Sequence, residues 1–314
     1  MKKKIKNVTL ITTITCVSLI GLSVYGTDSL FADKVSKEYM SWLHNVDDKK
    51  KLNEIFIPGT HNSGARYSFM DLSGKCQDIS IKSQLIIGVR YLDIRLKNDV
   101  GGLKIVHSFV DQKTSFKSVL STCYSFLIDN PSEFIIMSIK EEEEGNSKLA
   151  FEERLKREIN SKYFYHNENF PEKLQDVRGK IVLFSRYSSP TIGYDCYNGW
   201  KDSGEEKTNI FTLDNSNIHV QDYYEVPDID AKKDDIVRCS TESGYNINLN
   251  FTSGYLESAF PPNNAFDLAK EINPWLVTDL LKKQDIQSQV FVSDFITDTL
   301  AYSIIALNFD EENK

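Results

Sequence analysis

Short runs of apolar residues recur along the chain after residue 50, and several are separated by stretches with apolar residues at helical spacing. Uninterrupted apolar runs of this length are typical of strands that are buried on both faces, as in a parallel sheet. The sequence predicts eight strands, at residues 54–58, 89–96, 103–106, 133–140, 180–185, 218–224, 245–251 and 289–294.

Helical spacing predicts five helices, at residues 116–128, 148–159, 229–239, 274–283 and 297–307. Strands that alternate with helices indicate the α/β class, and eight such strands indicate a (β/α)8 TIM-type barrel in a single domain. We expect the barrel to be distorted, because residues 97–102 are too few to hold a crossover helix. Residues 186–217 are expected to be mostly loop.

Residues 1–32 are predicted to be a secretory signal peptide. Four lysines lie among the first six residues, and residues 8–24 are uncharged and largely apolar. Small residues indicate cleavage after Gly26 or after Ala32, which assigns residues 33–314 to a secreted, extracellular barrel. A membrane anchor is the alternative, which the short stretch rich in Thr and Ser disfavours.

The chain is acidic, with a formal net charge of −8. Without residues 1–32 it holds 33 basic and 44 acidic residues, so its overall charge does not favour nucleic acid or anionic lipid as partners. The run of four glutamates at 141–144 is expected to cap a helix and to face water.

Four cysteines remain after removal of the signal: Cys76, Cys123, Cys196 and Cys239. An even count in a secreted chain permits two disulfides, and isolated buried thiols are the alternative. No two of them have the CxxC spacing of a zinc knuckle.

Polar residues gather at or just after the predicted strand ends. They are His61, Asp93, Arg95, His107, Lys140, Arg186, Asp222, Tyr224, Asn250 and Asp294. The carboxyl ends of all strands in a barrel meet at one face, where active sites lie. Each residue alone has an ordinary structural reading, as a strand cap or an ion pair, and their convergence is what indicates a site.

Two histidines among arginine and lysine suit phosphodiester chemistry. One imidazole takes a proton from an attacking hydroxyl, the other gives one to the leaving oxygen, and the cations offset the charge on phosphorus. A metal site is the competing interpretation, but zinc or calcium would not favour Arg95 and Lys140 beside its ligands. His44, His166 and His219 lack this context and are expected to be surface or packing residues.

Several segments resemble the bacterial phosphatidylinositol-specific phospholipases C and the catalytic X region of the eukaryotic enzymes. They are IPGTH at 57–61, RYLDIR at 90–95, VH at 106–107, IMSIK at 136–140 and VRGKIVL at 177–183. The resemblance runs from about Trp42 to the C-terminus, and the first three segments in this order are fairly specific.

The resemblance implies a mechanism. His61 would be the general base that deprotonates the inositol 2-hydroxyl, and His107 the acid that protonates the diacylglycerol oxygen. Arg95 would bind a phosphate oxygen, and Asp294 would orient His61. The first products would be diacylglycerol and inositol 1,2-cyclic phosphate, with slower hydrolysis to inositol 1-phosphate. The inositol would be held by Lys140, Arg186, Asp222 and Tyr224.

The resemblance also implies no metal cofactor, because Arg95 and Lys140 stand where calcium-dependent relatives carry acidic ligands. One residue departs from the metal-independent pattern: Asn62 stands where Asp is usual, and calcium-dependent relatives also carry Asn there. Calcium is therefore the alternative cofactor. Asn62 is included among the substrate-binding residues, and Asp93 is the alternative carboxylate partner for His107.

An apolar rim is expected to touch phosphatidylinositol membranes peripherally. Its predicted residues are Phe69, Met70, Tyr197, Trp200, Tyr255, Leu256, Phe260 and Phe266; packing on the barrel is the alternative. The sequence leaves open whether glycosylphosphatidylinositol anchors are also cut. A monomer is expected, and secretion together with specificity for a host lipid suggests a virulence or scavenging role. A metal-dependent glycerophosphodiesterase or sphingomyelinase-like enzyme and a non-catalytic lipid-binding relative are the alternative functions.

Overall fold

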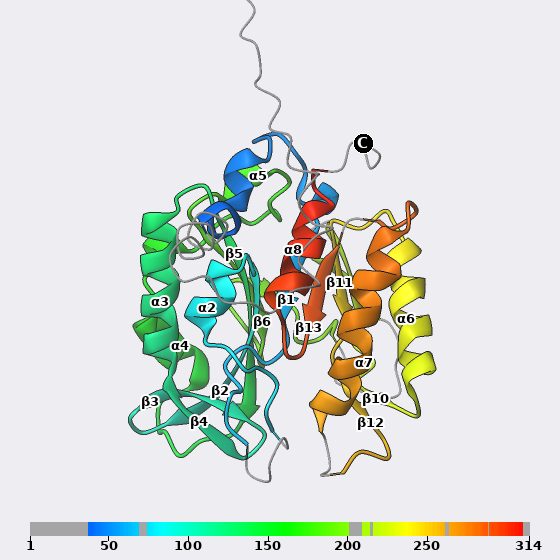
Figure 1. The fold of residues 1–314 in the computed structure, drawn as a ribbon. Coiled ribbons are helices and arrows are strands. Elements are labelled where there is room, and N and C mark those ends of the chain that lie inside the picture. The colour runs from blue at the N-terminus through cyan, green and yellow to red at the C-terminus, as the bar shows by residue number, and fades with distance from the viewer. Residues whose placement is uncertain are drawn as a thin grey trace, which may run out of the picture.

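Eight parallel strands curl into one sheet at the centre of the protein (Figure 1). The computed structural model describes residues 37–68, 74–200, 209–213, 216–260, 264–287 and 289–309, so the predicted signal peptide lies outside the described residues. In spatial order the parallel strands are β7 (Tyr194–Asp195), β6 (Ile181–Arg186), β5 (Ile135–Glu143), β2 (Tyr91–Asp99), β1 (Ile57–Thr60), β13 (Val290–Ser293), β11 (Ile247–Phe251) and β9 (Ser216–Gln221). The predicted TIM-type α/β barrel is confirmed.

The barrel is open on one side in the described part of the chain, because β7 does not pair with the other edge. That edge is formed by β8 (Asn209–Leu213), which pairs antiparallel with β9. A separate ladder joins β10 (Glu225–Val226) to β12 (Tyr255–Leu256).

Two of the strand assignments were wrong in detail. The third predicted strand forms β3 (Gly102–His107), but it runs antiparallel to β2 and continues into β4 (Val110–Ser115) as a hairpin outside the parallel series. The eighth parallel strand is instead β7, in a segment predicted to be loop. Six residues between two strands allow a hairpin turn but no helical crossover, which is why β3 folds back.

Helices cover the outside of the sheet (Figure 1). They are α2 (Ile81–Ile86), α3 (Phe116–Asp129), α4 (Phe151–Glu158), α5 (Leu174–Val177), α6 (Ile229–Thr241), α7 (Ala265–Thr278) and α8 (Asp298–Ala306), with short 3-10 turns η2 (Trp42–Asn45), η3 (Leu52–Glu54), η4 (Ser161–Tyr163) and η5 (Leu280–Lys282). Four of the five predicted helices correspond to α3, α4, α6 and α8. The remaining one, predicted at residues 274–283, was misplaced. The observed helix α7 begins nine residues before Pro274, which lies inside it rather than in its first turn.

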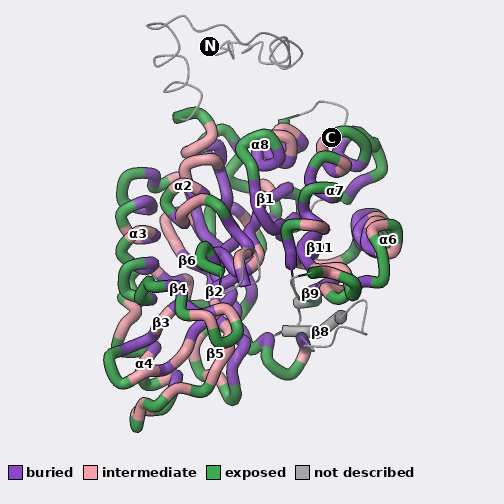
Figure 2. The backbone as a smooth tube through the Cα atoms, turned by 60° about the horizontal axis from the view of Figure 1, so that its bottom comes forward, coloured by how far each residue is buried: buried purple, intermediate pink, exposed green. Residues whose placement is uncertain are grey.

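The strands separate two apolar clusters. Along β5, Ile136 packs in an inner cluster with side chains from the other parallel strands, whereas Ile135, Met137 and Ile139 pack in an outer cluster against the helices. Figure 2 looks toward the lower end of the strands and shows buried backbone between the helices on the left and those on the right. Side chains alternate along a strand, so the inner cluster defines which positions face the barrel interior.

A buried ion pair anchors the start of β2 and β5. Arg90 donates to Glu133 Oε2 from Nη2 at 2.7 Å and from Nε at 2.9 Å, and both side chains are fully buried. Its other donors bind the carbonyls of Met40, Leu85 and Val89. One arginine thus ties the N-terminal segment, the turn after α2 and the strand before the site together.

The four cysteines are free and buried, so the alternative of isolated thiols is the one that the structure has. In the described part of the chain, no helix is both long and apolar enough to cross a bilayer.

We expect Arg90→Met to destabilise the fold by about 3–5 kcal/mol, because it leaves the buried Glu133 carboxylate unpaired. Urea unfolding followed by circular dichroism measures the free energy of unfolding. The control is Arg157→Met, which removes an exposed pair with Glu153 and should cost no more than about 1 kcal/mol. Equal effects of the two substitutions would contradict the anchoring role of Arg90.

Candidate active site

Three cations lie in register on the inner face of three adjacent parallel strands. The register pairs Arg95 of β2 with Lys140 of β5, and Lys140 with Arg186 of β6. Each lies two or four residues after a residue of the inner cluster, so its side chain faces the barrel interior. This row of positive charge suits an anionic group at the end of the barrel.

Two carboxylates offset two of the three positive charges in the row. Asp93 Oδ2 accepts from Arg95 Nε at 3.2 Å, and its Oδ1 lies 3.7 Å from Arg186 Nη1. Glu142 accepts from Arg95 Nη1 and pairs with Lys140 Nζ, both at 3.2 Å. Burial would raise the pKa of both acids, but Arg95 acting with Arg186 lowers that of Asp93, and Arg95 with Lys140 holds that of Glu142 well below its usual range.

His61 lies directly after β1, between an acid and a cation. Its Nδ1 is 2.7 Å from Asp294 Oδ1, and its Nε2 is 2.8 Å from Arg95 Nη2. A guanidinium only donates, so Nε2 accepts that bond while Nδ1–H donates to Asp294. The unprotonated nitrogen therefore faces the cation row. Asp294 is itself held by Gly254 N, which donates to its Oδ2 at 3.2 Å.

The β2–β3 hairpin carries His107 to the site. The antiparallel register pairs Leu96 with Ile105, so the chain returns and His107 reaches the level of the inner residues late in β2. His107 Nδ1 lies 2.9 Å from the carbonyl oxygen of Gly74. Burial and then Arg95 lower the pKa of His107 from 6.5 to about 4.

The predicted pairing of Asp93 with His107 is wrong. The Asp93 carboxylate contacts Arg95, Arg186 and the backbone N–H of Asn62 instead, and it lies 4.0 Å from His61 Nε2. The side-chain amide of Asn62 is buried, and neither of its polar atoms has a hydrogen-bond partner among the described residues. Asn62 has a φ of 42°, a left-handed conformation that Asn tolerates better than most residues.

Asp222 and Tyr224 come just after β9, which ends at Gln221 and not at Tyr224 as predicted. Asp222 Oδ2 accepts from Trp200 Nε1 at 3.1 Å, and the Arg186 guanidinium lies 3.7 Å from the centre of the Trp200 ring. Trp200 is thus buried against two site residues, and its assignment to the membrane rim was wrong. The Tyr224 ring lies 6.1 Å from that of Tyr255.

Of the remaining expectations, the one for Asn250 is wrong and those for the three other histidines are confirmed. Asn250 faces outward and binds Gln289 and the carbonyl of Ile236 in α6, so it is not part of the site. His44 and His166 are exposed and His219 is buried against Tyr245, as surface and packing residues should be. Phe69 and Met70 lie outside the described residues.

Sequence reasoning missed two neighbours of the site. Glu142 was assigned to a solvated helix cap, although β5 continues to Glu143 and brings it to the cations. The signal that could have found it is its position two residues after Lys140, on the same strand face. Cys76 was considered as a disulfide partner or an isolated buried thiol, yet its Sγ lies 3.8 Å from His107 Nδ1.

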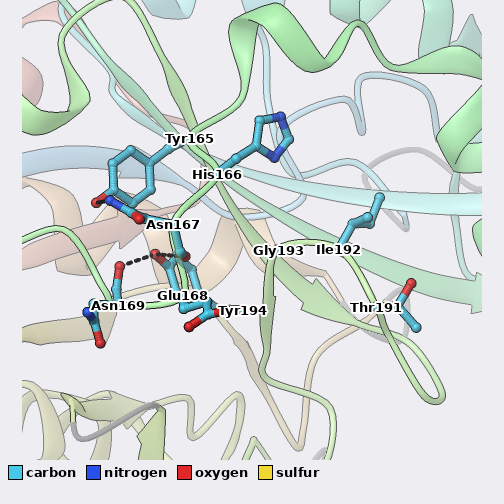
Figure 3. A pocket seen from close by; sticks show the side chains of 9 residues that line it. All are labelled: Tyr165, His166, Asn167, Glu168, Asn169, Thr191, Ile192, Gly193 and Tyr194. Atoms are coloured by element: carbon cyan, nitrogen blue, oxygen red, sulfur yellow. Dashed lines mark hydrogen bonds between the residues drawn. The ribbon is translucent and has the colours of Figure 1, made fainter.

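A separate cavity of about 590 Å³ lies between residues 165–169 and residues 191–194 (Figure 3). The Tyr194 hydroxyl donates to the carbonyls of Asn167 and Asn169 there, and most of the lining is exposed. None of the predicted site residues lines this cavity, so we place the active site at the cation row.

Comparison with known proteins supports the resemblance to the phosphatidylinositol-specific phospholipases C. The model for the X domain of phosphatidylinositol-specific phospholipase C matches residues 49–187. A 1-phosphatidylinositol phosphodiesterase of Staphylococcus aureus is 32% identical over 297 residues, which cover 87% of this chain and 88% of the relative. The chain belongs to the phosphatidylinositol-specific phospholipase C family.

Solved structures of this family have the same fold. One phosphatidylinositol-specific phospholipase C of S. aureus superposes with a TM-score of 0.76 at 28% identity, covering 89% of this chain and 99% of that one. The enzyme from Listeria monocytogenes superposes with a TM-score of 0.67 at 26% identity, covering 88% and 99%.

Calcium, the alternative cofactor for this member of the phospholipase C family, does not fit the donors at the cation row. Calcium takes six to eight oxygen ligands. Asp93 and Glu142 are each already paired with cationic side chains, and Arg95 and Lys140 would repel a calcium ion. We therefore derive no step through a calcium ion.

We expect His107 to titrate with a midpoint near 4 in the free protein, and the phosphate of bound inositol 1-phosphate to raise that midpoint by offsetting Arg95. Because the folded pKa lies below the unfolded value near 6.5, His107 should stabilise the fold above pH 6.5 and lose this contribution as the pH falls through 4. Nuclear magnetic resonance of the imidazole measures both midpoints, with His107→Gln to assign the signal. An unperturbed midpoint in the free protein would contradict the geometry.

Proposed function

We propose that the protein is a secreted phosphatidylinositol phosphodiesterase, a phospholipase C that works by histidine acid–base catalysis without a metal. The observation that carries this proposal is the position of His61, with Nδ1 2.7 Å from Asp294 Oδ1 and Nε2 2.8 Å from Arg95 Nη2. Membership in the family and the names of its relatives support the substrate class.

His61 is the general base in this proposal. The inositol 2-hydroxyl gives its proton to Nε2 as its oxygen attacks phosphorus, and the Asp294 carboxylate stabilises the imidazolium that forms. In the structure, Arg95 donates a hydrogen bond to Nε2. A bound phosphodiester would attract the guanidinium to one of its own oxygen atoms. Lys140 lies next to Arg95 in the row, and its positive charge helps to stabilise the negative charge that develops on the phosphoryl oxygens.

His107 is the general acid, protonating the diacylglycerol oxygen as its bond to phosphorus breaks. With a pKa near 4 it is neutral in the free protein at neutral pH, so it must gain its proton when substrate binds. The phosphate supports that uptake because it offsets Arg95, the nearby charge that disfavours imidazolium. The products are diacylglycerol and inositol 1,2-cyclic phosphate, which the same groups open more slowly to inositol 1-phosphate.

Arg186, Asp222 and Tyr224 hold the inositol ring. Trp200 fixes the first two of these by stacking on the guanidinium and donating to the carboxylate, so a polyol would meet a prearranged donor and acceptor. Asn62 supplies buried amide atoms whose hydrogen-bonding capacity is unused among the described residues.

We expect the protein to convert phosphatidylinositol vesicles to cyclic inositol phosphate in excess chelator, with Asp294→Asn lowering kcat by about 10²–10⁴-fold through the wrong His61 tautomer. Phosphorus-31 resonance follows substrate and products. His166→Ala, on an exposed histidine of the other cavity, should keep full activity.

Turnover that needs added calcium would overturn the metal-free part of the proposal. Absence of turnover with and without calcium would favour a lipid-binding relative or a different phosphodiester substrate. The same assay with a glycosylphosphatidylinositol-anchored protein tests whether such anchors are substrates, and size-exclusion chromatography tests the expected monomer.

Membrane contact is proposed to be peripheral and apolar. Tyr197, Phe260 and Phe266 are exposed, with Phe260 at 83% of its surface, whereas Tyr255 and Leu256 are half-buried in and around β12. We expect Phe260→Ser to weaken vesicle binding by up to about tenfold, the worth of burying part of a phenyl ring, and to leave hydrolysis of a soluble short-chain substrate unchanged.

The matched control is Ile128→Ser in α3, which is 61% exposed at the end of the barrel opposite the site. Vesicle sedimentation measures the membrane binding of both variants. An equal loss of binding for the two variants would contradict this contact surface.

For secretion, the mass of the protein recovered from culture medium should correspond to a chain that begins at Thr27 or Asp33.

A further inference from the structure

Three different donor atoms converge behind the general base. The ligand atoms of His61, Cys76 and Asp294 all lie within 4.8 Å of one another. We propose that these residues form an inhibitory site for a borderline or soft divalent cation such as Zn²⁺ or Cd²⁺. This would be distinct from the calcium question, because it uses the opposite edge of the His61 ring from the cation row.

The backbone holds the thiol in this position. Cys76 N donates to the carbonyl of Ala65 at 2.9 Å, and Cys76 accepts from Phe295 N at 2.7 Å, one residue after Asp294. Cys76 is 1% exposed and is one of four cysteines that form no disulfide. The site therefore needs no large backbone movement to present its sulfur.

The donor set selects the kind of ion. One sulfur, one imidazole nitrogen and one carboxylate oxygen are ligands that Zn²⁺ uses at three positions while leaving a fourth open. Cadmium has an even stronger preference for sulfur. Calcium and magnesium prefer oxygen ligands, and the set offers a single carboxylate.

Binding must displace a proton. Burial, and then Asp294, raise the pKa of the Cys76 thiol well above its ordinary value, so the group is neutral before metal binds. The cation replaces the thiol proton, which leaves to solvent, and a sulfur–metal bond forms. The charge of the ion takes the place of the proton beside the Asp294 carboxylate.

Occupation of Nδ1 explains why the ion inhibits. The imidazole proton now on Nδ1 has to move to Nε2, which then has no lone pair to accept the substrate proton. That Nε2–H also faces Arg95 Nη2, at present 2.8 Å away, so the guanidinium must withdraw. The metal thus removes the base and displaces the phosphate-binding cation in one step.

The test titrates Zn²⁺ and Cd²⁺ into the protein and follows both phosphatidylinositol turnover and cadmium–thiolate ultraviolet absorbance. We expect inhibition that a chelator reverses, with no effect of Ca²⁺ or Mg²⁺ at the same concentration. Measured against its own rate without metal, Cys76→Ser should raise the inhibitory concentration by at least about tenfold, and it should lose the absorbance.

Cys239→Ala is the matched control. Cys239 is also buried and also has an imidazole nitrogen, that of His219, within 3.9 Å, but it lies on α6 away from the site. It should keep both inhibition and absorbance. The turnover readout rests on the proposed function, whereas the absorbance does not. Unchanged inhibition in Cys76→Ser, or its loss in Cys239→Ala, would overturn the site, as would a parent protein that gives no absorbance with Cd²⁺.

Discussion

The register between β2, β5 and β6 is the constraint on which the site depends. It places Arg95, Lys140 and Arg186 side by side on the interior face, where water is scarce and like charges repel. Such a row is stable only if carboxylates accompany it, and Asp93 and Glu142 do so from the same strands. A shift of one residue would turn every one of these side chains to the helices. The buried Arg90–Glu133 pair at the start of the same strands helps to hold that register.

Charge balance also decides which groups bind the donors of Arg95. Without a ligand, the carboxylates and the lone pair of His61 Nε2 occupy the donors of Arg95. In the proposed mechanism a phosphodiester anion would compete for those donors, which would free His61 Nε2 and raise the pKa of His107 together. Substrate binding and the preparation of both histidines would then follow from one exchange of partners around a single guanidinium.

Much of this could be predicted from the sequence, since apolar runs fixed seven of the parallel strands and charged residues at their ends marked the interior face. Other features have no periodic signal. The β7 strand is two residues long, and β5 extends past Lys140 through glutamates alone, so Glu142 was read as solvated. The contact of Trp200 with Arg186 and Asp222 comes from a loop, and His107 reaches the site by a hairpin rather than by a barrel strand.

That hairpin also means that the two histidines of the site stand on different supports. His61, the proposed base, directly follows β1 and contacts Asp294, which follows the neighbouring strand β13. His107, the proposed acid, stands on the β2–β3 hairpin, whose turn around Val100 and Gly101 packs little and faces solvent. The β2–β3 register, and not the length of this turn, sets the level of His107. A two-residue slip of that register would move His107 along β2 and change its distance from His61 while the parallel strands stayed in place.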